Sequence, residues 1–134
     1  MKMSYKRSAS LTFRGFEVNP EVVQSMVGVD AKLLGEKGSP MKANRSNVWQ
    51  KSFAKFEIEF ADDFPICGMI PALLNHASGL KNLCAIRNRI SPEFIEVNLV
   101  LPIRSSESQE DGFLEIDTLG ELYELRATVG FSFV

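Results

Sequence analysis

The sequence predicts a single α+β domain, with one mainly antiparallel sheet of four to five strands and two to three helices packed on one face. Segments with a hydrophobic period of two alternate along the chain with segments of helical period. The predicted strands mix apolar and polar residues instead of running apolar throughout, which is typical of a sheet with one covered face. The length of 134 residues suits one domain, 1–134, and ten Phe can supply one core.

Alternation of apolar and polar residues predicts four half-buried strands. The most regular pattern is that of residues 55–60, where Phe56, Ile58 and Phe60 alternate with charged residues. The predicted strands are 8–16, 50–60, 94–101 and 127–133. The expected order along the chain is therefore strand, helix, strand, helix, strand, helix, strand.

The first helix has clear signals at both ends. It is expected to start at Asn19-Pro20-Glu21, because Asn is a good N-cap, Pro suits the first helical position and Glu favours a helix N-terminus. Gly28 is expected to end it in a left-handed conformation.

The second helix is predicted over 66–80, where apolar residues recur at helical spacing. Gly68 and Pro71 oppose a straight helix, so we expect a kink or a fresh start at Pro71. Residues 80–87 are weakly helical. Asp117 is expected to cap a last short helix, with Leu119, Leu122, Tyr123 and Leu125 as its apolar residues.

The segment from Gly28 to Trp49 has no clear periodicity, and we interpret 29–47 as a long loop. Loops of this length are uncommon in compact domains and are usually functional or disordered. This segment is therefore the first candidate for a working surface. Residues 1–7 are expected to form a mobile N-terminal tail, and the polar residues 104–112 an exposed loop.

Composition excludes several classes of protein. No apolar run approaches the roughly 20 residues that span a bilayer, and no apolar segment follows the basic residues at the N-terminus, so we expect neither a membrane span nor a signal peptide. The two cysteines lack CxxC spacing, which favours a reducing, cytoplasmic compartment.

Charge is unevenly distributed along the chain. The first 55 residues hold ten basic and four acidic side chains (+6), and the remaining 79 hold five basic and thirteen acidic (−8), which together give −2. Either the fold interleaves the two halves, or it presents a basic face opposite an acidic one and favours an oriented partner.

The residues that catalysis would need are sparse. His76 is the only histidine, and a Cys–His pair would have to join it to Cys67 or Cys84. We expect His76 to lie at the flank of an apolar helix face and both cysteines to be small buried residues. One His and two Cys show no zinc spacing, and the glycines at 35 and 38 fit no phosphate-loop motif, so we expect no metal and no cofactor.

Trp49 is the residue we single out as a candidate binding residue. It either pins the loop to the sheet or acts as a partly exposed anchor for a partner, because Trp and Arg are enriched at interface hot spots. Met41, Arg45, Val48 and Lys51 are the neighbours expected to complete such a patch.

Basic side chains around an aromatic residue can also hold single-stranded nucleic acid. Asp30 and Glu36 dilute the charge of this loop, and the sequence pI is near 5.5. Dedicated nucleic-acid binders are usually more basic, so we expect no nucleic-acid partner.

Residues 11–52 resemble domain-of-unknown-function family 4279, an uncharacterised bacterial family. The similarity lies in the strand LTFRGF, the helix start Asn19-Pro20-Glu21, the glycine Gly28, the glycine-containing loop and Trp49 at the opening of the next strand. The strand-helix-strand ending is also similar. Asp30-Ala31 stand where the family has Pro-Thr, and phenylalanines replace a tyrosine in the last strand. The resemblance implies a stand-alone bacterial α+β domain and brings no catalytic residue with it.

Together these observations predict a small cytoplasmic domain that is not an enzyme and that binds another protein or a second copy of itself, in an immunity or accessory role. The binding surface is expected at residues 33–49 and the neighbouring sheet edge. The alternative is a small-ligand or nucleotide-binding domain, with a pocket between the sheet and the helix predicted over 66–80.

Overall fold

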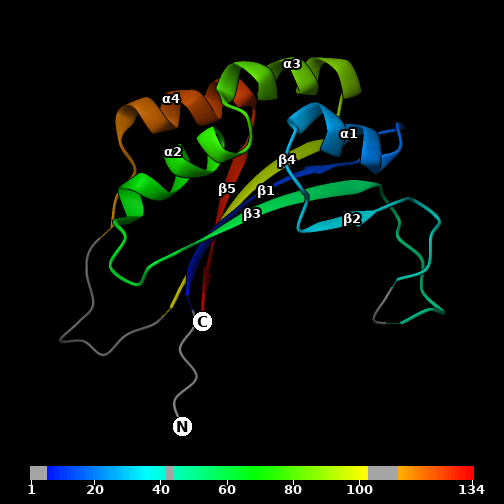
Figure 1. The fold of residues 1–134 in the computed structure, drawn as a ribbon, viewed down its shortest axis with the longest axis horizontal. Coiled ribbons are helices and arrows are strands. Elements are labelled where there is room, and N and C mark those ends of the chain that lie inside the picture. Colours follow the sequence, from blue (N-terminus) through cyan, green and yellow to red (C-terminus); the bar gives the residue numbers. More distant parts are fainter. Residues whose placement is uncertain (1–5, 42–43, 103–111) are drawn as a thin grey trace, which may run out of the picture.

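A computed structural model describes residues 6–41, 44–102 and 112–134, and it confirms the predicted α+β class. One sheet has the strand order β2-β3-β1-β4-β5, and four helices accompany it in the described residues (Figure 1). The strands are β1 (Arg7–Arg14), β2 (Leu33–Gly35), β3 (Phe53–Phe60), β4 (Phe94–Leu101) and β5 (Thr128–Phe133). The helices are α1 (Pro20–Val27), α2 (Ile66–His76), α3 (Leu80–Ile90) and α4 (Ile116–Leu125).

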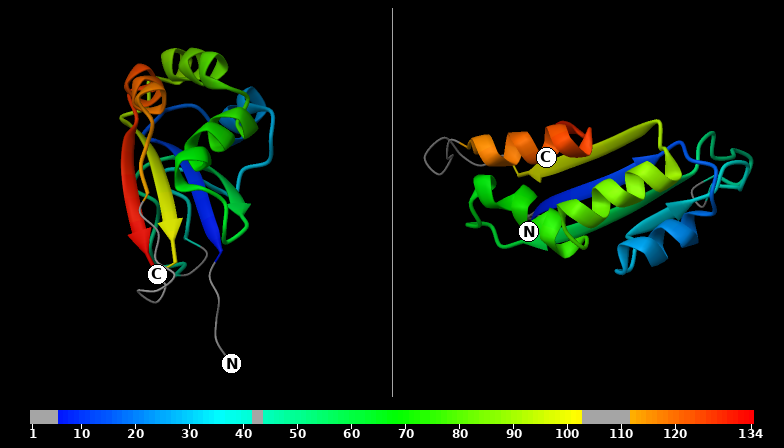
Figure 2. Two further views of the ribbon diagram at one scale, coloured as in Figure 1. Left: turned by 90° about the vertical axis from the view of Figure 1, so that its left-hand side faces the viewer. Right: turned by 90° about the horizontal axis from the view of Figure 1, so that it is seen from above.

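The sheet is mostly antiparallel, as predicted, with one parallel pair. β1 is antiparallel to β3 and β4, and β2 is antiparallel to β3. β5 runs parallel to β4, and α4 lies between these two strands in the chain. Figure 2 shows the helices gathered over one face of the sheet. β2 and β5 are therefore the two edge strands.

The core lies between this face and the helices. Ala9, Leu11 and Phe13 of β1 are fully buried there, as their alternation predicts. Ser10 and Thr12 are buried as well, although they occupy the opposite face of the sheet. β1 is the central strand, so the longer side chains of β3 and β4 cover these short polar side chains from both sides.

α1 follows its sequence signals closely. Asn19 is the N-cap, and its Oδ1 accepts a hydrogen bond of 2.8 Å from the Glu21 N–H. Gly28 ends the helix with a φ of 85°, and its N–H donates to the Gln24 carbonyl. Both ends of α1 are thus fixed by local interactions that the sequence encodes.

The helix predicted over 66–80 ends at His76 in the structure. The described residues contain four helices, and the prediction of two to three was too low. α2 contains Pro71 and stops at His76, because Ser78 and Gly79 adopt positive φ angles of 76° and 89°. A new helix, α3, then begins at Leu80. α4 begins one residue before Asp117, which lies in its first turn instead of capping it.

The structure adds elements inside two segments that we interpreted as irregular. β2 lies within 29–47, where Leu33–Gly35 pairs with Phe53–Lys55. β1 begins at Arg7, inside the expected N-terminal tail, and the Arg7 side chain is buried. Of the loop predicted over 104–112, only Gly112 belongs to the described residues. No helix among the described residues is long and apolar enough to cross a membrane.

Candidate functional site: a groove beside Trp49

Residues 38–41 and 44–49 form the two arms of a small hairpin, held together by backbone hydrogen bonds. The Trp49 N–H donates to the Ser39 carbonyl at 3.0 Å, and the Met41 N–H donates to the Asn47 carbonyl at 2.9 Å. The Gly38 N–H donates to the Trp49 carbonyl at 2.9 Å and closes the base. Its two arms pair over only a few residues, which explains why the sequence shows no strand period here.

This hairpin forms one wall of a groove of about 420 Å³. The edge strand β2 and the start of α1 form the other walls. The groove is lined by Asn19, Pro20, Glu21, Leu33, Leu34, Gly35, Glu36, Ser39, Pro40, Met41 and Trp49. Its volume lies in the range of small-molecule and side-chain binding pockets.

The position of Trp49 is set by Phe53, the first residue of β3. The two rings meet edge to face, with centroids 4.7 Å apart and an interplanar angle of 74°. Phe53 is only 3 % exposed, and it lies opposite Gly35 in the β2–β3 pair. The Arg14 guanidinium lies over the Phe53 ring at 5.2 Å from its centroid. Trp49 is therefore braced against the sheet while one side of it lines the groove.

Among the described residues, two carboxylates and no cation line the groove. Glu21 stands in the first turn of α1, and Glu36 follows β2 directly. The rest of the lining is mainly apolar, including Leu33, Met41 and Trp49. This arrangement favours an apolar group that carries or adjoins a positive charge.

The five residues predicted for the binding patch separate in the structure. Met41 and Trp49 come together in the groove lining. Val48, 40 % exposed, pairs with Pro40 in the hairpin but lies outside the lining. Arg45 is exposed near the hairpin turn and is also outside it.

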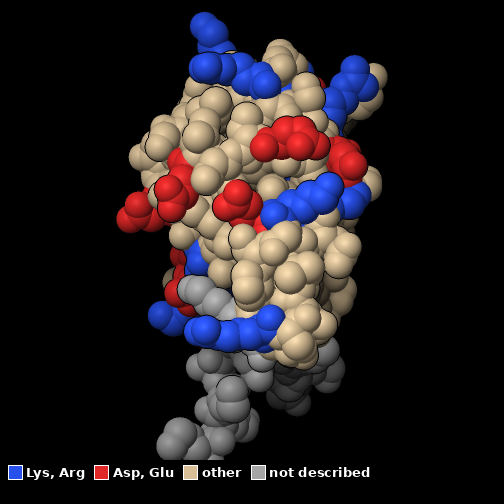
Figure 3. All heavy atoms as spheres, turned by 90° about the vertical axis from the view of Figure 1, so that its right-hand side faces the viewer, with Lys and Arg blue, Asp and Glu red and all other residues tan. Residues whose placement is uncertain are grey.

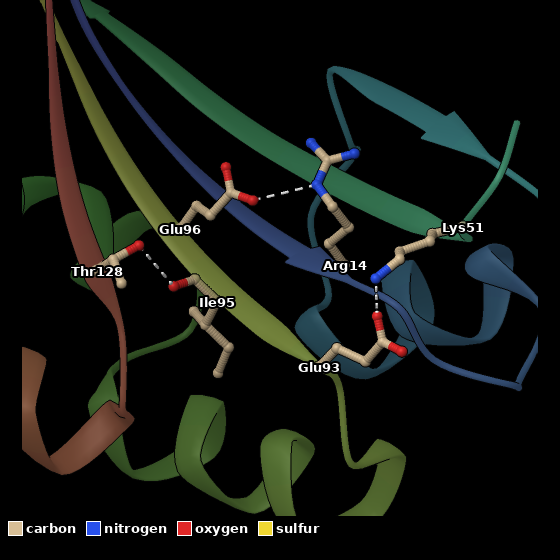
Figure 4. Close-up of polar contacts among 6 residues, drawn as sticks. All are labelled: Arg14, Lys51, Glu93, Ile95, Glu96 and Thr128. Carbon is tan, nitrogen blue, oxygen red and sulfur yellow. Dashed lines mark hydrogen bonds and ion pairs between the residues drawn. The ribbon is translucent and has the colours of Figure 1, made fainter.

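Lys51 faces a different neighbourhood. Its Nζ forms an ion pair with Glu93 (Figure 4) and lies 4.9 Å from the centroid of the Phe94 ring. Nearby, Arg14 Nε pairs with Glu96 Oε1 at 3.1 Å. Lys51 thus links the segment before β3 to the segment before β4. Neither Lys51 nor Arg45 belongs to the described lining of the groove, which is therefore more acidic than the sequence indicated.

Sequence reasoning missed the wall that α1 and β2 supply. The helix start at Asn19-Pro20-Glu21 was visible, but nothing local places it beside Leu33 and Leu34. That placement depends on β2 pairing with β3, which brings residues 33–35 next to 53–55. A three-residue strand is too short to show a period.

Basic residues from the first 55 positions lie next to acidic residues from the rest of the chain. Each ion pair found among the described residues joins a cation from the first 55 residues to a carboxylate beyond them: Arg14–Glu96, Lys32–Glu57, Lys51–Glu93 and Lys55–Glu57. Figure 3 shows the two signs mixed over one side of the molecule. Of the two alternatives, these observations support interleaved halves and not a basic face opposite an acidic one.

The cysteines and the histidine stand apart from the groove. Cys67 and Cys84 are free and partly buried, and His76 is exposed at the end of α2. Burial raises the pKa of the Cys84 thiol, partly offset by Arg87, and Glu124 raises it further. Among the described residues, no group of three His, Cys, Asp or Glu side chains is placed to hold a metal ion.

Comparison of the chain with protein-family models, with curated proteins and with solved structures finds no match. The resemblance to domain-of-unknown-function family 4279 therefore stays a prediction.

Proposed function

We propose that this protein is a cytoplasmic, non-enzymatic interaction module that binds a segment of another protein in the groove beside Trp49. The observation that supports this most is the lining itself, in which Met41 and Trp49 meet the apolar wall of β2. Partly exposed Trp in a shaped apolar hollow is the usual form of an interface hot spot.

The chemistry of the groove defines the partner segment. An apolar side chain would fill the space between Leu33, Met41 and Trp49, and a neighbouring Lys or Arg would face Glu21 or Glu36. β2 pairs with β3 alone, so its backbone is an edge against which an extended segment can lie. We therefore expect a partner segment with an aromatic or aliphatic residue next to a basic one.

The structure also supports the alternative of a small-ligand domain. A second cavity, of about 280 Å³, is lined by Ile66 at the start of α2 and by residues at one end of the sheet, and it favours this alternative. It is lined by different residues from the Trp49 groove, so the two hypotheses can be tested separately.

The interaction hypothesis is tested by affinity capture from the source organism, followed by calorimetry with the purified partner. Trp49→Ser is expected to weaken binding about 30-fold or more, because a hot-spot side chain contributes roughly 2 kcal/mol or more. Val48→Ser is the matched control, since Val48 lies in the same hairpin but outside the groove. Both variants must melt at the same temperature.

Charge gives a second readout of the same groove. Glu36→Lys is expected to weaken a partner that presents a basic residue, and the loss should shrink as salt rises, because salt screens exposed charges. A partner that binds Trp49→Ser and Glu36→Lys as tightly as the native protein contradicts the proposal. Capture of no partner by the native protein contradicts it as well.

A further inference from the structure

The second cavity lies at the far end of the sheet from the Trp49 groove. Arg7, which lines it, pairs with Phe60 at the end of β3, whereas Phe53, which supports Trp49, stands at the start of that strand. The cavity is lined by Arg7, Ile66, Leu101, Pro102, Gly112, Phe113, Leu114, Phe131 and Phe133. Among the described residues that line the cavity, Arg7 is the one charged side chain and the others are apolar.

Arg7 is buried, and its Nε hydrogen-bonding capacity is unused. Arg7 is only 5 % exposed. Its Nη1 donates to the Phe64 carbonyl, and its Nε is buried without a hydrogen-bond partner. None of the ion pairs found among the described residues includes Arg7. A guanidinium has five N–H donors, and burying its charge without a counter-charge is costly. The geometry therefore calls for an anion beside Arg7.

The start of α2 adds a second favourable element. Ile66, the first residue of this eleven-residue helix, also lines the cavity. No side chain caps the helix at Pro65, and its first turn holds no acidic residue. The positive end of the helix dipole therefore lies beside the cavity and favours a negative charge there.

The other lining residues select an apolar body for the ligand. Phe131 and Phe133 of β5 are 49 % and 64 % exposed, although both lie on the helix-covered face of the sheet, where Leu99 and Leu101 are their partners on β4. Together with Leu114, they line the same cavity as Arg7 with apolar side chains. A ligand with one anionic group and an apolar tail would cover these rings and pair with Arg7 at once.

We propose that this cavity binds a small apolar carboxylate, whose carboxylate accepts paired hydrogen bonds from Arg7 and whose tail lies against Leu114, Phe131 and Phe133. A planar carboxylate matches the guanidinium fork better than a neutral oxygen does. A volume of about 280 Å³ holds on the order of nine groups the size of a water molecule at ~30 Å³ each, which suits a medium-chain carboxylic acid.

The test is calorimetric titration of the full chain with three probes: octanoate, 1-octanol and acetate. Octanoate is expected to bind, 1-octanol to bind about 10- to 100-fold more weakly because it lacks the charge-assisted hydrogen bonds, and acetate not to bind at the same concentrations. Equal binding of octanoate and 1-octanol, or no binding of octanoate, overturns the proposal.

Substitutions identify the residue responsible. Arg7→Met keeps an apolar stem of similar length, and it is expected to weaken octanoate binding about 10- to 100-fold. Arg14→Met is the matched control, because Arg14 is on the same strand but pairs with Glu96 on the opposite face. Leu114→Trp should block the cavity with Arg7 intact, so it tests the proposal even if Arg7→Met does not fold.

Thermal melting without ligand separates binding from a structural role. If Arg7 serves to bind an anion, Arg7→Met loses an uncompensated buried charge and melts no lower than the native protein. If Arg7 serves only to hold the Phe64 carbonyl, the variant melts lower and octanoate binding is unaffected, which overturns the proposal. Trp49→Ser should leave octanoate binding unchanged, so this site and the groove beside Trp49 succeed or fail independently.

Discussion

Gly35 is the position at which the support of Trp49 is most easily disturbed. A Cβ atom added at Gly35 would stand 2.7 Å from Cζ and 2.8 Å from Cδ1 of Phe53, closer than real Cβ contacts allow. The Phe53 ring is buried and contacts both Trp49 and Arg14. In Gly35→Ala the ring must therefore move, and Trp49 loses the surface that braces it.

The size of the effect follows from overpacking of a buried position. Forcing one extra carbon into a packed site costs about 1–3 kcal/mol. For a domain of this size, each kcal/mol lowers the melting temperature by roughly 4 °C, so Gly35→Ala is expected to melt about 4–12 °C lower. Its free energy of unfolding in urea should fall by the same 1–3 kcal/mol, approximately.

Trp49 itself reports the local change, because it is the only tryptophan of the chain. In Gly35→Ala its fluorescence should be quenched more readily by acrylamide under native conditions. Gly120→Ala is the control, since a Cβ at Gly120 in α4 meets no atom within 4 Å and should leave Trp49 unaffected. Native-like stability together with native-like quenching in Gly35→Ala would refute this account of how Trp49 is positioned.

Three further substitutions or treatments probe the fold and the thiol. Asn19→Ala removes the cap of α1 and should lower stability in urea by about 1 kcal/mol; an unchanged midpoint would contradict the capping role. Leu73→Ala leaves a cavity at a fully buried position of α2 and should cost about 2–5 kcal/mol in the same assay, whereas a loss under 1 kcal/mol would place Leu73 outside the packed core. Burial raises the pKa of Cys84, so a smaller fraction of this thiol is thiolate at pH 8 than of an ordinary thiol. Iodoacetamide should therefore modify Cys84 more slowly, and the rate of modification should increase as pH rises. Alkylation at the rate of a free thiol would contradict this.

The strands and α1 were predictable because their signals are local. The alternation in residues 94–101 reports directly which side chains face the helices, and Ile95, Val97 and Leu99 are buried as expected. The start and end of α1 are likewise fixed by Asn19 and Gly28, which act on their immediate neighbours. Local patterns of this kind survive folding because no distant contact competes with them.

Both candidate sites depend on contacts that no local pattern records. β2 exists because residues 33–35 pair with β3, and that pairing creates the groove in which Met41 and Trp49 meet Leu33. Arg7 follows a basic, non-periodic stretch and was assigned to a mobile tail, yet it begins the central strand and is buried. The pairing of Arg7 with Phe60 of β3 places it in the sheet, and no local pattern in residues 1–7 indicates that pairing.

The edge strand β5 shows a similar limit. Alternation correctly predicted a strand at the end of the chain, and it placed Phe131 and Phe133 on its apolar face. Alternation cannot reveal that this strand lies at the edge, where both rings stay about half exposed or more. Burial at an edge is decided by what lies beside the strand, and the sequence of the strand itself does not contain that information.

Fluorine NMR on the chain labelled with 5-fluorotryptophan tests the central claim most directly, since Trp49 gives the only resonance and a protein partner adds none. Titration with the captured partner is predicted to shift this resonance and to saturate at one partner per chain, while the Val48→Ser control behaves as the native protein does. A partner that saturates the chain by calorimetry and leaves the Trp49 resonance in place would contradict the groove as the binding surface.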